Sequence, residues 1–157
     1  MIFIDETWAK TNMTRLRGRS ARGERLIAAL DAQGVRCSMV VDGAVNGDIF
    51  HALVEQILVP KLQPGDVVVM DNLSSHKRVR TRELIESIGA DLVFLPPYSP
   101  DLNPIEMVFS KIKQLLRLLA LRTKSALWDS MQAVLNRGTP SDATNCFKHY
   151  GYTIHKE

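Results

Sequence analysis

Long apolar runs and cysteines are both scarce in this sequence. Every apolar run is far shorter than the roughly 20 residues of a membrane helix, and the N-terminus lacks a basic segment followed by a long apolar stretch. The two cysteines, Cys37 and Cys146, are far apart and outside any C-x-x-C pattern, which argues against a disulfide framework and against a zinc site. We therefore expect a cytoplasmic protein with no membrane partner.

The sequence also lacks the length for a second full domain. Its 157 residues, 45% of them apolar and 24% charged, suit one globular core with a solvated surface. No internal repeat, low-complexity tract or interior linker divides it. Residues 1–157 are therefore predicted to form a single domain.

Positive charge is small in total but concentrated in two clusters. The net charge is only +3, whereas five arginines stand within eleven residues against a single acid, Glu24. These arginines are Arg15, Arg17, Arg19, Arg22 and Arg25. The second cluster comprises His76, Lys77, Arg78, Arg80 and Arg82. Each cluster taken alone is as consistent with a solvated face or a mobile loop as with a nucleic-acid contact.

Several short runs are predicted to be strands. Those at 2–4, 67–70 and 92–95 are continuously apolar, which is typical of central strands covered on both faces. A further run at 37–41 is bounded by turn residues, and the alanine-rich run 27–30 can pair with it across a turn.

Helices are predicted in the gaps, from caps and from apolar residues at helical spacing. They span about 46–59, 74–89, 103–119, 123–136 and 141–150. The candidate caps of the first three are Asn46, Ser74 or Ser75, and Asn103. Along the chain, strands come first, strands and helices then alternate, and helices alone follow. This order predicts an α/β fold, in which a mixed sheet with parallel central strands has helices on its faces.

Asp5 and Asp71 follow two of the buried runs, in Met-Ile-Phe-Ile-Asp5 and Val-Val-Val-Met-Asp71. If these strands are parallel neighbours, about 4.8 Å apart, the two side chains emerge together at the carboxyl edge of the sheet. Carboxylates this close raise each other's pKa unless a cation neutralises them, and their oxygens suit Mg²⁺ or Mn²⁺. An aspartate often merely ends a strand, but the matched pair favours a metal site.

Glu106 has two interpretations. With Asn103 as N-cap it stands at the third helical position, where it could complete a capping box. However, the block PPYSPDLNPIE at 96–106, coming after Asp71-Asn72 and His76-Lys77, resembles the signature of bacterial insertion-sequence transposases in the mariner superfamily. The 34 residues between Asp71 and Glu106 match the spacing of that superfamily's second and third catalytic acids.

The resemblance covers nearly the whole chain, as far as Gly151-Tyr152. It implies a ribonuclease-H-like fold in which a DDE triad of Asp5, Asp71 and Glu106 binds two divalent ions, Mg²⁺ or Mn²⁺. The implied activity is metal-dependent DNA strand cleavage and transfer at insertion-sequence ends, by in-line displacement at phosphorus. DNA in a bacterial nucleoid is the implied partner, and a homo-oligomer is the implied state within the DNA complex.

Basic side chains near Asp71 are candidate DNA contacts. Such side chains at the start of a helix oppose its dipole, and a bound phosphate would resolve that conflict. The candidates are His76, Lys77 and Arg78, with Arg17 and Arg22 from the arginine-rich segment. Tyr98 and Asn103 are expected to fix the loop that carries Glu106.

Two departures from the family pattern leave alternatives open. Family members carry helix-turn-helix regions before the catalytic domain, whereas the first predicted strand begins here at Met1; we expect sequence recognition from elsewhere, for instance a separately encoded helix-turn-helix protein. The segment leading to Asp42-Gly43 is also short, which suggests a truncated second strand and a catalytically inactive remnant that only binds DNA. A phosphoacceptor receiver domain, suggested by Asp5-Glu6 with Asp71, is a remote alternative because no helix separates its first two predicted strands.

Overall fold

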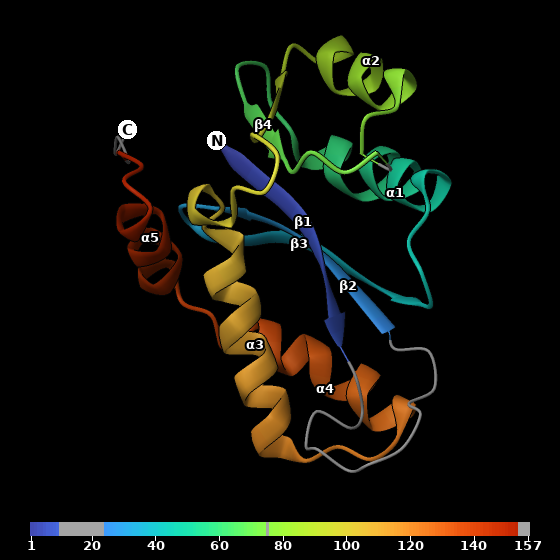
Figure 1. Ribbon diagram of the computed structural model, residues 1–157, viewed down its shortest axis with the longest axis vertical. Helices are drawn as coiled ribbons and strands as arrows, with labels where there is room; N and C mark the ends of the chain where they lie inside the picture. The colour runs from blue at the N-terminus through green and yellow to red at the C-terminus, as the bar shows by residue number, and fades with distance from the viewer. Residues whose placement is uncertain (10–23, 75, 154–157) are drawn as a thin grey trace.

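A five-stranded mixed sheet forms the centre of the described part of the protein. The computed structural model describes residues 1–9, 24–74 and 76–153, and its strands stand in the order β3-β2-β1-β4-β5 (Figure 1). The strands are β1 (Ile2–Ala9), β2 (Glu24–Asp31), β3 (Gly34–Asp42), β4 (Val67–Met70) and β5 (Asp91–Phe94). Strands β1, β2 and β3 are antiparallel, whereas β1, β4 and β5 are parallel. The predicted mixed sheet with parallel central strands is confirmed.

Helices fill the connections largely where the sequence predicts them. They are α1 (Gly47–Leu53), the π-helical turn η1 (Val54–Leu58), the 3-10 turn η2 (Val59–Lys61), α2 (Val79–Ser87), the 3-10 turn η3 (Pro100–Leu102), α3 (Ile105–Leu119), α4 (Lys124–Leu135) and α5 (Pro140–His149). Asn46 caps α1 as predicted, because its side-chain oxygen accepts from the N–H groups of Asp48 and Ile49 at 3.0 and 2.9 Å. None of the helices in these ranges is both long and apolar enough to cross a membrane.

Apolar side chains form two cores, one on each face of the sheet. Helices α3, α4 and α5 cover one face, and α1 and α2 cover the other (Figure 1). Neighbouring residues of β1 point into different cores: Phe3 and Ile4 are each 1% exposed. This burial on both faces explains why the run at 2–4 is continuously apolar instead of alternating.

Strand β2 is a full strand, so the expected truncation of the second strand is wrong. It pairs with β1 from Glu24 to Leu30 and continues into a tight turn to β3. In that turn Asp31 Oδ1 accepts from the N–H groups of Gln33 and Gly34 at 2.8 and 3.0 Å, and Gly34 has a φ of 137° that favours glycine. Helices cover both faces of β2, so packing outweighs the weak strand preference of its alanines.

Helix α2 begins later than predicted, at Val79 and not at Ser74. The alternative cap, Ser75, lies outside the described residues. Before the helix the chain forms a turn, in which the N–H of Lys77 donates to the carbonyl of Ser74 at 3.3 Å. The reason is His76, whose ring is inserted into the protein between this turn and α1 and is fully buried. A continuous helix from Ser74 is incompatible with the turn that this insertion requires.

Candidate active site

Asp5 and Asp71 come together where the parallel pairing of β1 with β4 ends. The last parallel pair is Ile4 with Met70, so these two acids are the next residue on each chain. The prediction that the first strand ends before Asp5 was wrong, because β1 continues to Ala9 along its antiparallel partner β2. Only β4 stops, and its end opens the edge of the sheet beside Asp5.

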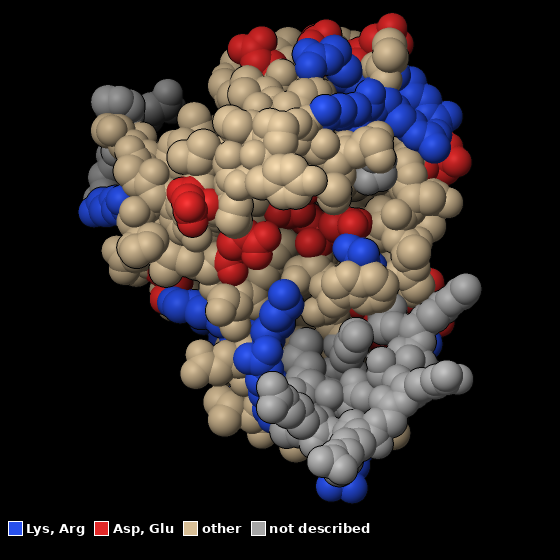
Figure 2. All heavy atoms as spheres, viewed as in Figure 1, with Lys and Arg blue, Asp and Glu red and all other residues tan. Residues whose placement is uncertain are grey.

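Glu106 reaches the same place from a different element. It lies in the first turn of α3, and it lines one cavity of about 340 Å³ with Asp5 and Asp71. The loop at 95–100 forms another wall of this cavity. Figure 2 shows acidic side chains gathered at the middle of the face, with basic side chains above and below them. We call Asp5, Asp71 and Glu106 the acidic edge.

Asp5 is the most buried member of the acidic edge, at 5% exposure. Its Oδ1 accepts from the N–H of Glu6 at 2.6 Å, and its Oδ2 accepts from the side chain of Asn103 at 2.7 Å. Burial first, and then the negative charges of Asp71 and Glu106, raise the pKa of Asp5 to about 7. A cation placed among the three acids would favour the ionised form.

Asn103 connects the strand acid to the helix acid. The structure does not use it as the predicted N-cap: Pro104 is at that position, and no side chain caps α3. The Asn103 side chain is buried and donates to Asp5, while its carbonyl accepts from the N–H of Glu106 at 3.1 Å. The capping box that was the alternative interpretation of Glu106 is therefore absent, and Glu106 lines the cavity. Nothing in the sequence distinguishes this role of Asn103 from capping.

Asp71 is held by two donors at one of its oxygens. Its Oδ1 accepts from Nδ1 of His76 and, at 3.3 Å, from the N–H of Leu73. The His76 ring is 0% exposed and stacks on Phe50 with 3.9 Å between ring centroids. The expectation that His76 contacts DNA is thus wrong, because a fully buried imidazole does not reach a phosphate. Its position five residues after Asp71 was visible in the sequence, but its burial was not.

The acidic edge suits a divalent cation by its chemistry. As the side chains stand, no three His, Cys, Asp or Glu within the described ranges are grouped to hold a metal ion. Both aspartates are turned toward protein donors, Asp5 toward Asn103 and Asp71 toward His76. The donor set consists of carboxylate oxygens, and the pKa of Asp5 is raised by burial first and by the nearby negative charges of Asp71 and Glu106 second. Both properties fit Mg²⁺ or Mn²⁺.

Apart from the buried His76, the basic cluster before and within α2 lies at the surface. Figure 2 shows Lys and Arg side chains gathered at the upper right, over α1 and α2. Lys77 is exposed, and the guanidinium groups of Arg78 and Arg80 both donate to Asp48 at the start of α1. Gly47 permits this, because a Cβ there would lie 2.1 Å from Nε of Arg78. The other two candidates, Arg17 and Arg22, lie outside the described residues.

Tyr98 differs from what we expected. It is 102% exposed, so it does not fix the loop by packing. Its backbone has a φ of 55°, an uncommon conformation for a residue other than glycine. Tyr98 nevertheless lines the cavity of the acidic edge, at whose border its ring is fully accessible.

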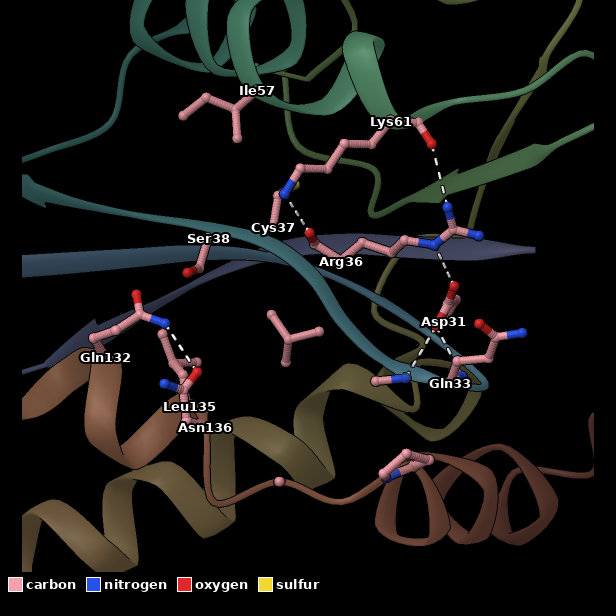
Figure 3. A pocket seen from close by; sticks show the side chains of 14 residues that line it. Asp31, Gln33, Arg36, Cys37, Ser38, Ile57, Lys61, Gln132, Leu135 and Asn136 are labelled. Carbon is pink, nitrogen blue, oxygen red and sulfur yellow. Dashed lines mark hydrogen bonds and ion pairs between the residues drawn. The ribbon is translucent and has the colours of Figure 1, made fainter.

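A larger cavity of about 730 Å³ lies along β3 and contains none of the candidate residues. Figure 3 shows that its charged side chains already have partners. Arg36 donates to Asp31 and to the carbonyl of Lys61, and the ammonium of Lys61 donates to the carbonyl of Arg36 at 2.7 Å. Size alone therefore does not locate the functional site, and the acidic edge remains the candidate.

The strand order, with three acids gathered beside the end of the parallel pairing of β1 with β4, is that of a ribonuclease-H-like domain. The chain belongs to the DDE superfamily endonuclease family, which matches it over residues 1–127. The predicted family and enzyme class are thus confirmed. No curated protein matches the chain.

Solved structures of Mos1 transposase share the fold. The Mos1 catalytic domain with Raltegravir and Mn is 16% identical, with a TM-score of 0.73, over 96% of this chain and 78% of that chain. The catalytic domain of Mos1 mariner transposase is 15% identical, with a TM-score of 0.70, over 98% and 83%. The Mos1 transposase in the paired-end complex with the left transposon end is 15% identical, with a TM-score of 0.78, over 95% of this chain and 51% of that chain. The chain therefore spans about half of the Mos1 chain in that complex, and the predicted ribonuclease-H-like fold is confirmed.

Proposed function

We propose that this chain is the catalytic domain of a transposase that cleaves and joins DNA strands at the ends of a mobile element. One observation carries the proposal: carboxylates from β1, from the end of β4 and from α3 line a single cavity. Membership of an endonuclease family and the fold of the Mos1 catalytic domain support it.

Asp5, Asp71 and Glu106 are the residues that we propose to hold two divalent cations, Mg²⁺ or Mn²⁺. Structures of the Mos1 catalytic domain with Mn and with Mg support this choice of ion. Cations bound there supply Lewis-acid stabilisation of the charge that develops on the reacting phosphate oxygens. The protein contributes the orientation of the ligands: Asn103 and the N–H of Glu6 fix Asp5, and the first turn of α3 presents Glu106.

We further propose that Lys77 and Arg78 bind the DNA backbone beside Asp71. Such contacts fix the register of a duplex but do not read its sequence. This domain matches about half of the Mos1 chain in the Mos1 paired-end complex. We infer that a helix-turn-helix region outside this domain recognises the ends of the element, on the same chain or a separately encoded one, and that the domain acts on DNA as a homo-oligomer.

The alternative of an inactive remnant rested on a truncated second strand. Strand β2 has eight residues and pairs along β1, so that ground for the alternative is gone. All three acids also line one cavity, which is what an active domain requires.

A nicking assay tests the proposal. Wild type should convert supercoiled plasmid to the nicked form in Mg²⁺ or Mn²⁺ and stop in EDTA, and Asp71→Asn should be inactive. Asp91→Asn is the matched control, because Asp91 is exposed at the opposite, amino end of the parallel strands. Nicking by Asp71→Asn at the wild-type rate, or no nicking by wild type together with no binding of Mn²⁺, would overturn the proposal.

A further inference from the structure

His76 is a buried polar side chain whose hydrogen-bonding capacity is only partly used. Its ring is 0% exposed, one face stacks on Phe50, and Nδ1 bonds to Asp71 Oδ1. The other ring nitrogen, Nε2, is buried and has no hydrogen-bond partner within the described part of the chain. Leaving such an atom unpaired costs stability, and an apolar ring would stack on Phe50 without that cost.

The two carboxylate oxygens of Asp71 differ in their hydrogen bonding. Oδ1 accepts from His76 and from the N–H of Leu73. A carboxylate oxygen only accepts hydrogen bonds, so Nδ1 of the imidazole carries the proton. No hydrogen bond from a described residue reaches Oδ2 of Asp71, whose side chain lines the cavity of the acidic edge. One oxygen is anchored, and the other is available to a ligand.

Glu6 lies behind the same site. Its side chain is 7% exposed, and Oε1 accepts from Arg25 at 2.6 Å. Its second oxygen, Oε2, is buried with no partner among the residues that the structure describes, and the carboxylate lies within electrostatic range of His76 and Asp71. The His76 imidazole therefore lies near two carboxylates, those of Asp71 and Glu6. Their negative charge favours the ring orientation in which the Nδ1–H of His76 donates to Asp71.

We propose that His76 is a positioning residue of the metal site, which holds Asp71 by Oδ1 so that Oδ2 faces the cation, with Glu6 as the charge that supports the imidazole. The inference rests on the proposed function, because it assigns a role toward the cation of that site. A hydrogen bond to a ligating carboxylate fixes its orientation, and loss of such a partner typically lowers metal affinity or activity about 10- to 100-fold.

Three substitutions separate the hydrogen bond from the packing. His76→Phe keeps a ring on Phe50 and removes both nitrogens. His76→Asn retains an amide donor near the position of Nδ1, whereas His76→Gln places its amide nearer to Nε2. His51→Phe is the matched control, because His51 bonds through Nδ1 to Thr81 at 2.9 Å and is not a member of the acidic edge.

The readout is Mn²⁺ affinity, from the electron paramagnetic resonance signal of free Mn²⁺ titrated with the full chain, beside the melting temperature in EDTA. We expect His76→Phe and His76→Gln to bind Mn²⁺ about 10- to 100-fold more weakly than wild type. His76→Asn should recover most of the affinity, and His51→Phe should bind like wild type. If His76→Phe does not fold, the comparison of His76→Asn with His76→Gln decides.

Two results would overturn the role of His76 and leave the proposed function intact. One is wild-type Mn²⁺ affinity in both His76→Phe and His76→Gln; the other is an equal loss in His76→Asn and His76→Gln, which would indicate packing alone. Absence of Mn²⁺ binding by wild type would instead overturn the proposed function, and this inference with it.

A double-mutant cycle tests the part of Glu6. If Glu6 acts on Asp71 through the imidazole, Glu6→Gln should weaken Mn²⁺ binding in wild type by a larger factor than in the His76→Phe background. Equal factors in both backgrounds would show that Glu6 acts on the cation by its charge alone, and would remove it from the inference.

Discussion

The acidic edge and the arginine pair, Arg78 with Arg80, both gather like charges, but they do so under opposite conditions. At the acidic edge Asp5 is 5% exposed, and its pKa is raised by this burial first and by its charged neighbours Asp71 and Glu106 second. The side chains of Arg78 and Arg80 are 38% and 51% exposed, and Asp48 lies between them as an internal counter-charge.

Burial decides what these charges cost. Water and salt screen the exposed arginines, so repulsion between them has little effect on stability. Asp5 is buried and Asp71 and Glu106 are half-buried, so their charges are screened less, and their repulsion persists until a cation binds. The acidic edge is therefore expected to respond strongly to metal and pH, and the arginine pair to salt and DNA.

The largest effect is expected from removing one acid. Glu106→Gln keeps the size of the side chain but removes a ligand charge, and should lower Mg²⁺-dependent nicking about 1000-fold, since a bound metal contributes several kcal/mol to such a reaction. Asp101→Asn is the control, an exposed acid five residues earlier in the same segment. A loss below about tenfold for Glu106→Gln would mean that Glu106 is not a ligand.

The next effect is the pH dependence of the metal-free protein. The pKa of Asp5 is raised in the folded state to about 7 from the ordinary 3.8, so folding favours its protonated form. Stability should therefore be full below about pH 4 and fall as the pH rises to about 7, by up to about 4 kcal/mol at 1.36 kcal/mol per pKa unit.

Urea unfolding in EDTA from pH 4 to 8 measures this effect. Asp5→Asn should flatten the dependence of stability on pH. At pH 8, Mn²⁺ should stabilise the wild-type protein by mass action and should stabilise the Asp5→Asn variant much less. A wild-type profile that rises between pH 4 and 7 would contradict the raised pKa of Asp5, and with it the expected response of the acidic edge to pH.

Most of the fold could be predicted because local patterns and packing agree in it. The continuous apolar run at 2–4 gave a central strand, and Asn46 gave the start of α1. The errors lie where tertiary contacts overrule a local signal. Strand β1 continues past Asp5 because β2 pairs with it, and α2 starts late because His76 is buried in the core.

The acids of the candidate site could be predicted from the sequence, but the side chains that hydrogen-bond to them could not. Asp5 and Asp71 each follow an apolar strand run, a signal that lies in the sequence itself. The roles of Asn103 and His76 depend on which partner each side chain meets, at separations of 98 and 5 residues. An amide at a helix start and a histidine in a basic cluster have the same local appearance whether they cap, bind DNA or hold a carboxylate.

A smaller effect is expected at the surface. Changing Lys77 and Arg78 together to Ala should weaken binding to every duplex by a similar factor and flatten the salt dependence, because each lost phosphate contact releases one counterion fewer. We expect wild-type binding to be weak, with Kd around 10⁻⁴ to 10⁻⁶ M, and without sequence preference. Fluorescence anisotropy with several unrelated duplexes across a salt series measures both, and tight, salt-insensitive binding to one sequence would contradict it.

The smallest effect should follow from Asp48→Asn. Arg78 and Arg80 both donate to this carboxylate, which stands in water at 67% side-chain exposure. Such exposed ion pairs contribute little to stability, so the melting temperature should stay close to that of wild type. DNA should bind about two- to threefold more tightly at low salt, because both arginines lose an internal competitor for phosphate. Glu86→Gln, which breaks the exposed pair with Arg82 on the same helix, controls for a general gain of positive charge. A marked fall in melting temperature for Asp48→Asn alone would show that the arginine pair is structural, and that burial does not separate the two regions.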